Sequence, residues 1–551
     1  MSPFRQLLRL FRDRFTDSDA LAPGAGYETN IYQILGFLAV PGLFVALYLI
    51  PRFMDLSFLK PGPRVDMELR ADHLFFVAYS FAVVGFATVF EWDMLFPDRR
   101  DFLILTPFPI RLRDLFGAKL AALGLFLLAI VVAANAFPVI LLPIFSAYIK
   151  QAHAAGVLRL MCAQVVGTGA AAAFAFFAVA AFQGLLINLA TPRFFRRLAP
   201  WIQMLGMSLM VLSLLLFPIY AASLRFLVET HPGWLRLFPP YWFAGVYELM
   251  LPRADPFFAS LGVFGWKALG CAIAVFCITW AVGFRRHYRR TLESEDSPGG
   301  RRLDSVLSPF TGSPEETAVF RFTGQILARS TKHRLFLATY WSVGVSLGLL
   351  VLGVVRDGRL GVSPEGLRSF PLLVTFFVIS GFRAAFQFPA ELPANWLFRM
   401  AEAGWGAASR RAARKRVIAS GLAPALLLFL PVEVVAWGWK TGLFHSVFQL
   451  GAGALLTEAL FWNFDKVPFT CSYFPGATNL AVLAGLYLYG FTNYSFMAAD
   501  LEASLERNPA QAVLCLAAAT AALMAIWRWH RPAAPIRFEA GEPEIQTLEL
   551  S

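Results

Sequence analysis

Two carboxylates lie inside long apolar stretches of the sequence, where an ionisable side chain is costly and therefore informative. Glu433 follows Pro431 in the stretch 417–437, and Glu458 lies in the stretch 444–462. Either side chain could line a polar pathway through the protein. Because both lie near the ends of their stretches, each could instead reach a polar boundary or pair with a neighbouring group. We interpret both primarily as structural residues and keep the pathway role as the alternative.

A second group of charged residues lies in the segment 91–120, where acidic and basic residues precede an apolar ridge. A short helix of this kind can dock in the cleft of a partner protein and transmit a rigid-body push. The alternative is that its arginines anchor the segment through positive-inside charge and contacts with lipid phosphates. The residues that we select for docking are Asp98, Arg99, Arg100, Asp101, Leu103, Leu105, Pro107 and Pro109.

The other reactive residue types match no catalytic or metal-binding pattern. The five cysteines lie in or beside apolar segments, at spacings that fit neither a zinc site nor a disulfide framework. The seven histidines form no His-Glu-x-x-His motif, and the chain has no Gly-x-x-x-x-Gly-Lys-Ser/Thr phosphate loop. We therefore predict no catalytic residue, no metal and no cofactor. If ATP drives the protein, another subunit must hydrolyse it.

Composition is that of a membrane protein. Hydrophobic residues make up 58% of the chain, charged residues only 15%, and the mean hydropathy is +0.59. Soluble domains are about 45–50% apolar and about 25% charged. A bilayer can solvate the 55 Phe and 14 Trp that a water-soluble core could not enclose. We therefore expect membrane lipids around the chain. The net charge of +12 indicates topology, and no basic soluble domain is present that would bind nucleic acid.

The elements that position the charged residues are predicted to be membrane-spanning helices. A span needs roughly 20 mostly apolar residues, and about twelve stretches approach that length. The predicted fold is therefore an all-α polytopic membrane protein with two six-helix halves. The first six spans are 32–50, 74–90, 120–145, 157–190, 201–219 and 257–284, and the second six are 335–355, 370–388, 417–437, 444–462, 480–497 and 510–527.

Charge distribution orients these helices. Lys and Arg concentrate on one side when both termini are placed in the cytoplasm, as the positive-inside rule requires. Before the first span, the apolar residues of the segment 4–15 share one helical face and Arg5, Arg9 and Arg12 share the other. This spacing predicts an amphipathic helix in the membrane interface. The alternative is a frayed basic tail.

Weak similarity between the halves indicates an internal repeat with a cytoplasmic linker between them. We expect an interface helix and lead-in at 1–30, a first half at 31–290, a linker at 291–315, a second interface helix at 316–334, a second half at 335–530 and a cytoplasmic tail at 531–551. One constant shift aligns Phe90 with Phe386, Pro97 with Pro393, Phe102 with Phe398 and Lys119 with Lys415.

The segment 91–120 resembles the loop after the second span in permease subunits of type-2 ATP-binding-cassette (ABC) exporters. In that family an acidic-basic cluster precedes a Leu-Leu-x-x-Leu-Pro-Ile-like stretch, matched here by the docking residues named above and Ile110. The resemblance implies a coupling helix that docks on a separate cytoplasmic ABC ATPase subunit, with an interface helix before the first span. It also implies short external re-entrant helices between the fifth and sixth spans, for which 237–251 is the candidate. An aromatic belt is the alternative there. The segment 498–509 looks too short for such a hairpin, so the second half is expected to differ.

These observations predict a transport subunit rather than an enzyme, in the cell inner (plasma) membrane. The expected function is that of an ABC-type exporter permease working by alternating access. One alternative is a twelve-span secondary transporter of the major-facilitator plan, although Asp98-Arg99-Arg100 lacks the glycine framing of that family's signature. Another is a membrane-embedded lipid-modifying enzyme, for which no paired catalytic carboxylates or metal-ligand set is visible.

Overall fold

The structure, a computed structural model, divides the chain into two compact units. The first unit comprises Met1–Asp296 with Val355–Arg359, and the second comprises Ser297–Val354 with Leu360–Ser551. The residues that the structure describes are 3–16, 39–40, 42–43, 47, 49–56, 58, 62–92, 95, 108, 110–215, 217, 230, 233, 237–252, 254–293, 311–356, 359–390, 405–462, 464, 466–470 and 489–529.

The described parts are almost entirely helical, and among them eight helices are long and apolar enough to cross a membrane. The prediction of an all-α polytopic membrane protein is confirmed at this level. Two further predicted spans contain shorter apolar helices, Trp201–Leu215 and Ala510–Ile526. The predicted span 32–50 lies mostly outside the described residues, and the first half of the span 480–497 does so too. The eight helices are Val65–Phe90, Arg113–Ile149, Ala154–Leu189, Pro256–Val282, Lys332–Leu352, Pro364–Ala385, Gly406–Trp437 and Trp439–Leu460.

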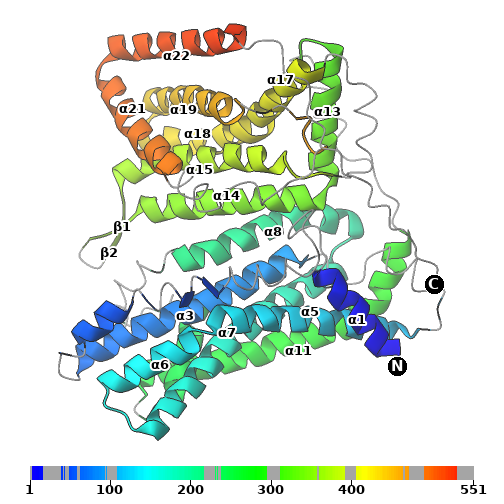
Figure 1. Cartoon of the computed structure of the whole chain (residues 1–551), viewed down its shortest axis with the longest axis vertical. Coiled ribbons are helices and arrows are strands. Elements are labelled where there is room, and N and C mark those ends of the chain that lie inside the picture. Colours follow the sequence, from blue (N-terminus) through cyan, green and yellow to red (C-terminus); the bar gives the residue numbers. More distant parts are fainter. Residues whose placement is uncertain are drawn as a thin grey trace, which may run out of the picture. The chain divides into compact units, whose positions relative to one another are not determined.

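Helix α3 is central to the first unit, where α5, α7, α8 and α10 pack against it (Figure 1). Helix α7 also packs against α11, and α1 packs on α5. The predicted span 120–145 falls within the long helical stretch Arg113–Ile149, in which α5 ends at Asn135 and α6 begins at Pro138, a residue without a backbone N–H. The helices are α1 (Pro3–Thr16), α3 (Pro63–Phe90), α5 (Leu112–Asn135), α6 (Pro138–Ile149), α7 (Ala154–Leu189), α8 (Pro192–Leu215), α10 (Pro239–Leu249) and α11 (Pro256–Glu293).

In the second unit α15 holds the central place and contacts α14, α18, α19 and α21. In the sequence, α14 and α15 are separated by two paired strands, β1 (Gly353–Arg356) and β2 (Arg359–Val362). The predicted span 335–355 therefore ends earlier, at Leu352. The helices are α13 (Pro314–Arg329), α14 (Thr331–Leu352), α15 (Pro364–Ala385), α17 (Trp405–Val417), the π-helical turn η5 (Ile418–Leu422), α18 (Ala423–Trp437), α19 (Trp439–Leu460), the π-helical turn η7 (Asn493–Met497), α21 (Ala498–Arg507) and α22 (Pro509–Trp529).

The second interface helix has other limits than the predicted 316–334. Ser313 caps α13 by accepting a hydrogen bond from the backbone N–H of Glu316, and Pro314 occupies the first turn, both strong helix-start signals. Ser330 has extended backbone geometry and separates α13 from α14. The prediction of one continuous helix at 316–334 is therefore wrong. The structure has the short helix α13, a break at Ser330, and then the long apolar helix α14.

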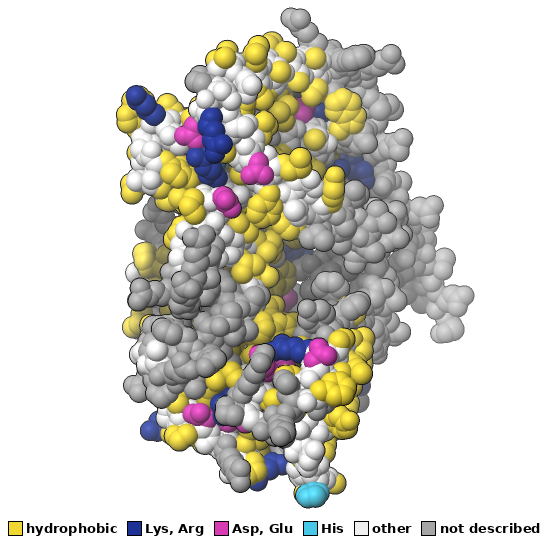
Figure 2. Space-filling model, turned by 90° about the vertical axis from the view of Figure 1, so that its left-hand side faces the viewer, with side chains coloured by type: hydrophobic (Ala, Val, Ile, Leu, Met, Phe, Trp, Pro, Cys, Tyr) yellow, Lys and Arg dark blue, Asp and Glu magenta, His cyan; other side chains and the backbone are white. Residues whose placement is uncertain are grey.

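Large apolar side chains cover much of the outside of the helices. Val435 is 88% exposed and Leu427 is 72% exposed, and Figure 2 shows many such hydrophobic side chains on one face of the molecule. Soluble monomers rarely expose extended apolar surface. The exposed apolar side chains are therefore those that a lipid environment would solvate.

Candidate functional site

The predicted docking residues cannot be assigned a geometry. Asp98, Arg99, Arg100, Asp101, Leu103, Leu105, Pro107 and Pro109 lie outside the described residues. Their chain neighbours Ile110 and Arg111 are described, and α5 begins directly after them. The docking role of the segment 91–120 thus stays a prediction.

Glu458, one of the two carboxylates found in apolar sequence, is paired with a cation. It lies near the end of α19, and its Oε2 is 2.7 Å from Nη1 of Arg414 on α17. The side chains of both residues are less than one-tenth exposed. A buried carboxylate beside a buried guanidinium is a structural ion pair. This geometry favours the structural interpretation of Glu458.

Glu433 has a different environment, because it faces a hydroxyl and an imidazole. Its Oε2 accepts a hydrogen bond from Ser446 Oγ at 2.8 Å, and its Oε1 lies 3.6 Å from Nε2 of His445. His445 Nδ1 is in turn 2.7 Å from Oε2 of Glu502 on α21. We call these four residues, Glu433, His445, Ser446 and Glu502, the His445 cluster.

Local chain geometry explains how Glu433 and His445 meet. Gly438 has a φ of +82° and alone connects α18 to α19, a conformation that glycine adopts without steric cost. Gly442 lets the two helices approach closely, because a Cβ there would lie 3.0 Å from the backbone N of Val434. The tight antiparallel turn therefore directs Glu433 and His445 toward each other.

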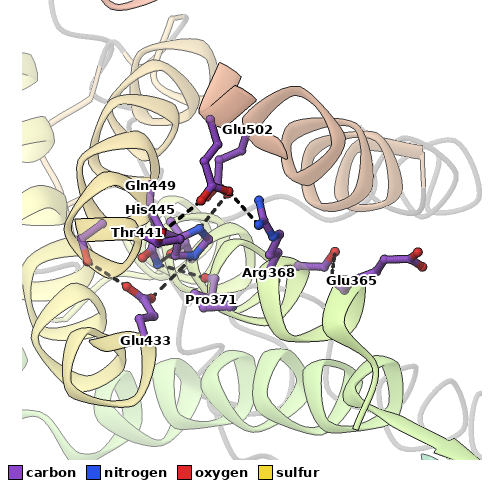
Figure 3. A network of polar contacts seen from close by, with 12 residues as sticks. Glu365, Arg368, Pro371, Glu433, Thr441, His445, Gln449 and Glu502 are labelled. Carbon is purple, nitrogen blue, oxygen red and sulfur yellow. Dashed lines mark hydrogen bonds and ion pairs between the residues drawn. The ribbon is translucent and has the colours of Figure 1, made fainter. Parts of the chain in front are cut away.

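The His445 cluster is closed off from solvent. His445 is 0% exposed, Glu502 is 1% exposed and Glu433 is 2% exposed. The indole of Trp437 packs edge to face against the imidazole, with ring centroids 5.4 Å apart. Figure 3 shows His445 between Glu433 on one side and Glu502 on the other.

A second set of contacts ties the surrounding helices together. Arg368 on α15 pairs with Glu506 on α21 at 2.7 Å, and Thr441 on α19 donates to the same carboxylate at 3.0 Å. Gln449 on α19 donates to Thr375 Oγ1 at 2.7 Å, and also to the carbonyl oxygen of a residue one turn earlier on α15. Helices α15, α18, α19 and α21 thus share one polar network (Figure 3).

The first unit contains an equivalent ion pair between α3 and its short helix α10. Arg70 on α3 pairs with Glu248 on α10 at 2.9 Å, as Arg368 pairs with Glu506 in the second unit. The segment 498–509 was predicted to be too short for a re-entrant hairpin, and the structure shows one short helix there. This helix, α21, packs on α15 as α10 packs on α3.

A second pair of contacts repeats as well. Three residues after Arg70, His73 Nδ1 contacts Gln164 Oε1 at 2.7 Å. Three residues after Arg368, the carbonyl oxygen of Pro371 accepts a hydrogen bond from Gln449. Each glutamine is the eleventh residue of its helix, α7 or α19. The two units therefore resemble each other at single positions as well as in element order.

Sequence patterns singled out Glu433 but missed His445 and Glu502. A usable signal existed on α21, where Glu502 and Glu506 are four residues apart and therefore share one helical face. His445 and Gln449 share a face of α19 for the same reason. No local pattern, however, indicates that these faces meet.

Metal binding has no structural support in the described residues, in which no three His, Cys, Asp or Glu side chains are arranged to hold an ion. The chemistry open to the His445 cluster is proton transfer and hydrogen bonding, because imidazole and carboxylate groups exchange protons readily.

Comparison of the whole chain with protein-family models, curated proteins and solved structures finds no match. Any function must therefore be argued from the residues themselves.

Proposed function

We propose that the chain is the membrane-spanning permease of an ATP-driven ABC-type exporter. It would span the cell inner (plasma) membrane twelve times, with both termini in the cytoplasm, and would couple to a separate ATPase subunit. The observation that carries the proposal is the packing of an amphipathic helix against the first turns of the third span in each unit. Because the segment 91–120 resembles a coupling loop, this packing would connect that loop to the amphipathic helix.

In the first unit α1 packs on α5 through apolar side chains and one lysine. Leu7 and Phe11 of α1 are buried in the same cluster as Leu115 and Phe116 of α5. The ammonium of Lys119 lies 5.6 Å from the centroid of the Phe11 ring, a distance at which cation–π attraction operates. Helix α1 is therefore fixed to the helix that directly follows the proposed coupling loop.

The second unit repeats the arrangement with α13 and α17. The Arg416 guanidinium lies 3.7 Å from the Phe320 ring centroid. Buried Glu316 of α13 contacts Lys415 at 2.6 Å and Arg411 at 3.2 Å, both on α17. A duplicated permease would carry one such interface helix and one coupling loop in each half.

Mechanical coupling follows from these contacts. A push on the segment 91–120 would act directly on α5, and the buried Leu7 and Phe11 contacts would move α1 with it. Packed helices move as rigid bodies because close-packed interfaces deform little. ATP-driven closure of the partner could thereby reorient the first unit for alternating access.

Charge on α1 favours a cytoplasmic, membrane-surface position. Arg5, Arg9 and Arg12 are exposed, while the buried face holds Leu7 and Phe11. Basic side chains on the outer face of an interfacial helix bind anionic headgroups. The same face would lie beside a docked ATPase.

Purification of the tagged chain from its native cells in mild detergent tests the proposal. The chain has no phosphate loop, so we expect co-purified ATPase activity to come from a partner and to be absent when the chain is expressed alone. The double variant Arg99→Glu and Arg100→Glu should lose that activity, because like charges at a desolvated contact cost several kcal/mol.

The matched control is Arg196→Glu with Arg197→Glu, another reversal of two adjacent arginines but outside the coupling segment. This variant should retain the partner. If both double variants lose the ATPase equally, or neither does while membrane insertion stays normal, the docking role is wrong. A secondary transporter of the major-facilitator kind is then the better interpretation.

A further inference from the structure

His445 stands between two carboxylates that come from two different helices. Its Nδ1 lies 2.7 Å from Glu502 Oε2, and its Nε2 lies 3.6 Å from Glu433 Oε1. Neither His445 Nε2 nor Glu433 Oε1 has a hydrogen-bond partner, and both atoms are fully buried. Two buried polar atoms therefore face each other across a gap slightly longer than a hydrogen bond.

The two contacts of the His445 ring depend on how many protons the ring carries. The contact between Nδ1 and Glu502 needs one proton between its two atoms. Ser446 already donates to the other oxygen of Glu433. With a single ring proton, the lone pair of Nε2 faces a carboxylate oxygen, which is repulsive. A second proton on Nε2 makes the ring an imidazolium with a carboxylate at each nitrogen, so both contacts become attractive.

The charges around His445 favour uptake of that proton. Glu433 of α18 and Glu502 of α21 face the ring, whereas Arg368 of α15 is engaged with Glu506 of α21. The other described charged residues on the packed helices are exposed or engaged elsewhere. Glu365, Lys440, Asp500 and Arg507 are exposed. Arg414 of α17 pairs with Glu458 near the far end of α19, Arg411 and Lys415 pair with Glu316, Arg416 lies over Phe320, Arg383 of α15 lies over Phe464, and Arg410 is buried within α17. Turn η5 and residues 510–526 of α22 carry no carboxylate, imidazole or cation.

We propose that the His445 cluster is a proton-binding site, in which His445 takes up and releases one proton between Glu433 and Glu502. Ionisable residues within membrane-spanning segments commonly mark proton relays. The inference does not rest on the exporter function, because it concerns only contacts inside the second unit. A proton-coupled step could belong to an ATP-driven permease or to a secondary transporter.

Proton binding at His445 would control how firmly α21 is held. Glu502 and Glu506 lie four residues apart on this short helix and attach it to α19 and α15. The Arg368–Glu506 pair joins α21 to α15 at 2.7 Å. The Glu502 contact strengthens when the imidazole gains a proton and weakens when it loses one. Proton uptake at His445 therefore strengthens one of the two contacts between α21 and α19, the other being the hydrogen bond from Thr441 to Glu506.

Trp437 provides a spectroscopic reporter, because its indole contacts the imidazole edge to face at 5.4 Å. An imidazolium quenches the fluorescence of a neighbouring indole more strongly than a neutral imidazole does. The difference in emission between purified wild type and Trp437→Phe, followed from pH 4 to pH 9, isolates this residue. We expect one transition, which disappears in His445→Gln.

Glu433→Gln and Glu502→Gln test the two carboxylates with little change in volume. Each should shift the midpoint of the transition to lower pH by about one to three units, because each removes an anion that favours the imidazolium. Glu365→Gln, at an exposed position of α15, is the control and should leave the midpoint in place.

Three outcomes would overturn the proposal. The first is a wild type without any transition in this range. The second is a transition that persists in His445→Gln, and the third is a midpoint that Glu433→Gln and Glu502→Gln move no more than Glu365→Gln does. All measurements use the purified chain without an ATPase partner. Failure of the exporter proposal therefore leaves their interpretation unchanged.

Discussion

Replacing Glu458 by Leu should destabilise the protein strongly. At 2.7 Å and an effective dielectric constant of about 20, the attraction between Arg414 and Glu458 is about 6 kcal/mol before desolvation is subtracted. The exposed fractions of the side chains are only 8% for Arg414 and 6% for Glu458, so solvent screening is small. Removing one partner of a buried pair typically costs about 3–5 kcal/mol, because the other charge stays buried. We expect a loss of that size for Glu458→Leu.

The double variant Arg414→Met with Glu458→Leu should recover much of the lost stability. Replacing an entire buried ion pair by apolar side chains of similar volume is often neutral or stabilising. Methionine keeps most of the length of arginine and adapts to irregular space. The double variant should therefore be more stable than either single variant, which is a non-additive pattern that only interacting residues produce.

Thermal unfolding of the detergent-purified protein measures this pattern. The four proteins needed are wild type, the two single variants and the double variant. If Glu458→Leu unfolds at the wild-type temperature, or if the double variant is less stable than both single variants, the ion pair is not structural. Glu458 would then return as a candidate for the polar pathway.

Two pairs of substitutions test how the short helices are held, one pair by packing and the other by charge. A Cβ at Gly262 of α11 would lie 2.5 Å from the backbone carbonyl of Gly245 on α10, so Gly262→Ala should cost about 1–3 kcal/mol by overpacking. Gly270→Ala on the same helix meets no atom within 4 Å and should match or exceed wild-type stability in the same thermal assay. Arg368→Glu should lower stability by about 1 kcal/mol, since both side chains of its pair are partly exposed, and adding Glu506→Arg should restore it. Equal melting temperatures of the two alanine variants, or a charge swap that restores nothing, would contradict these contacts.

Hydrophobic length alone predicted where most helices exist, because a run of apolar residues long enough to span a bilayer has few other stable conformations. Helix limits depend instead on single residues. Pro138 starts α6 within a stretch predicted as one span, and the proline itself was a readable signal. Ser330 separates α13 from α14 through backbone geometry, which neither composition nor periodicity indicates.

The basic segment before the ninth predicted span shows a different limit of sequence reasoning. The positive-inside rule places the arginines between the eighth and ninth predicted spans in a cytoplasmic loop, yet α17 runs through η5 into α18. Arg414 and Arg416 are buried there, because Arg414 forms an ion pair with Glu458 and Arg416 stacks on the Phe320 ring. Both partners come from distant segments, so the local excess of charge indicated exposure where the tertiary structure provides compensation.

The two units share one polar contact of their short helices and differ in another. Both units hold their short helix with an arginine–glutamate pair, Arg70–Glu248 in one and Arg368–Glu506 in the other. The seventh residue of α19 is His445, and the seventh residue of α7 is Leu160, which packs against Tyr247 of α10 in an apolar cluster.

An apolar contact is thus sufficient to hold the short helix at this position in the first unit. Holding α21 therefore does not by itself require an imidazole between two carboxylates, which is a costly arrangement in a buried environment. Structural need accounts for the repeated arginine–glutamate pairs. The His445 cluster exceeds that need and occurs among the described residues of the second unit alone, as expected of a site that exchanges a proton.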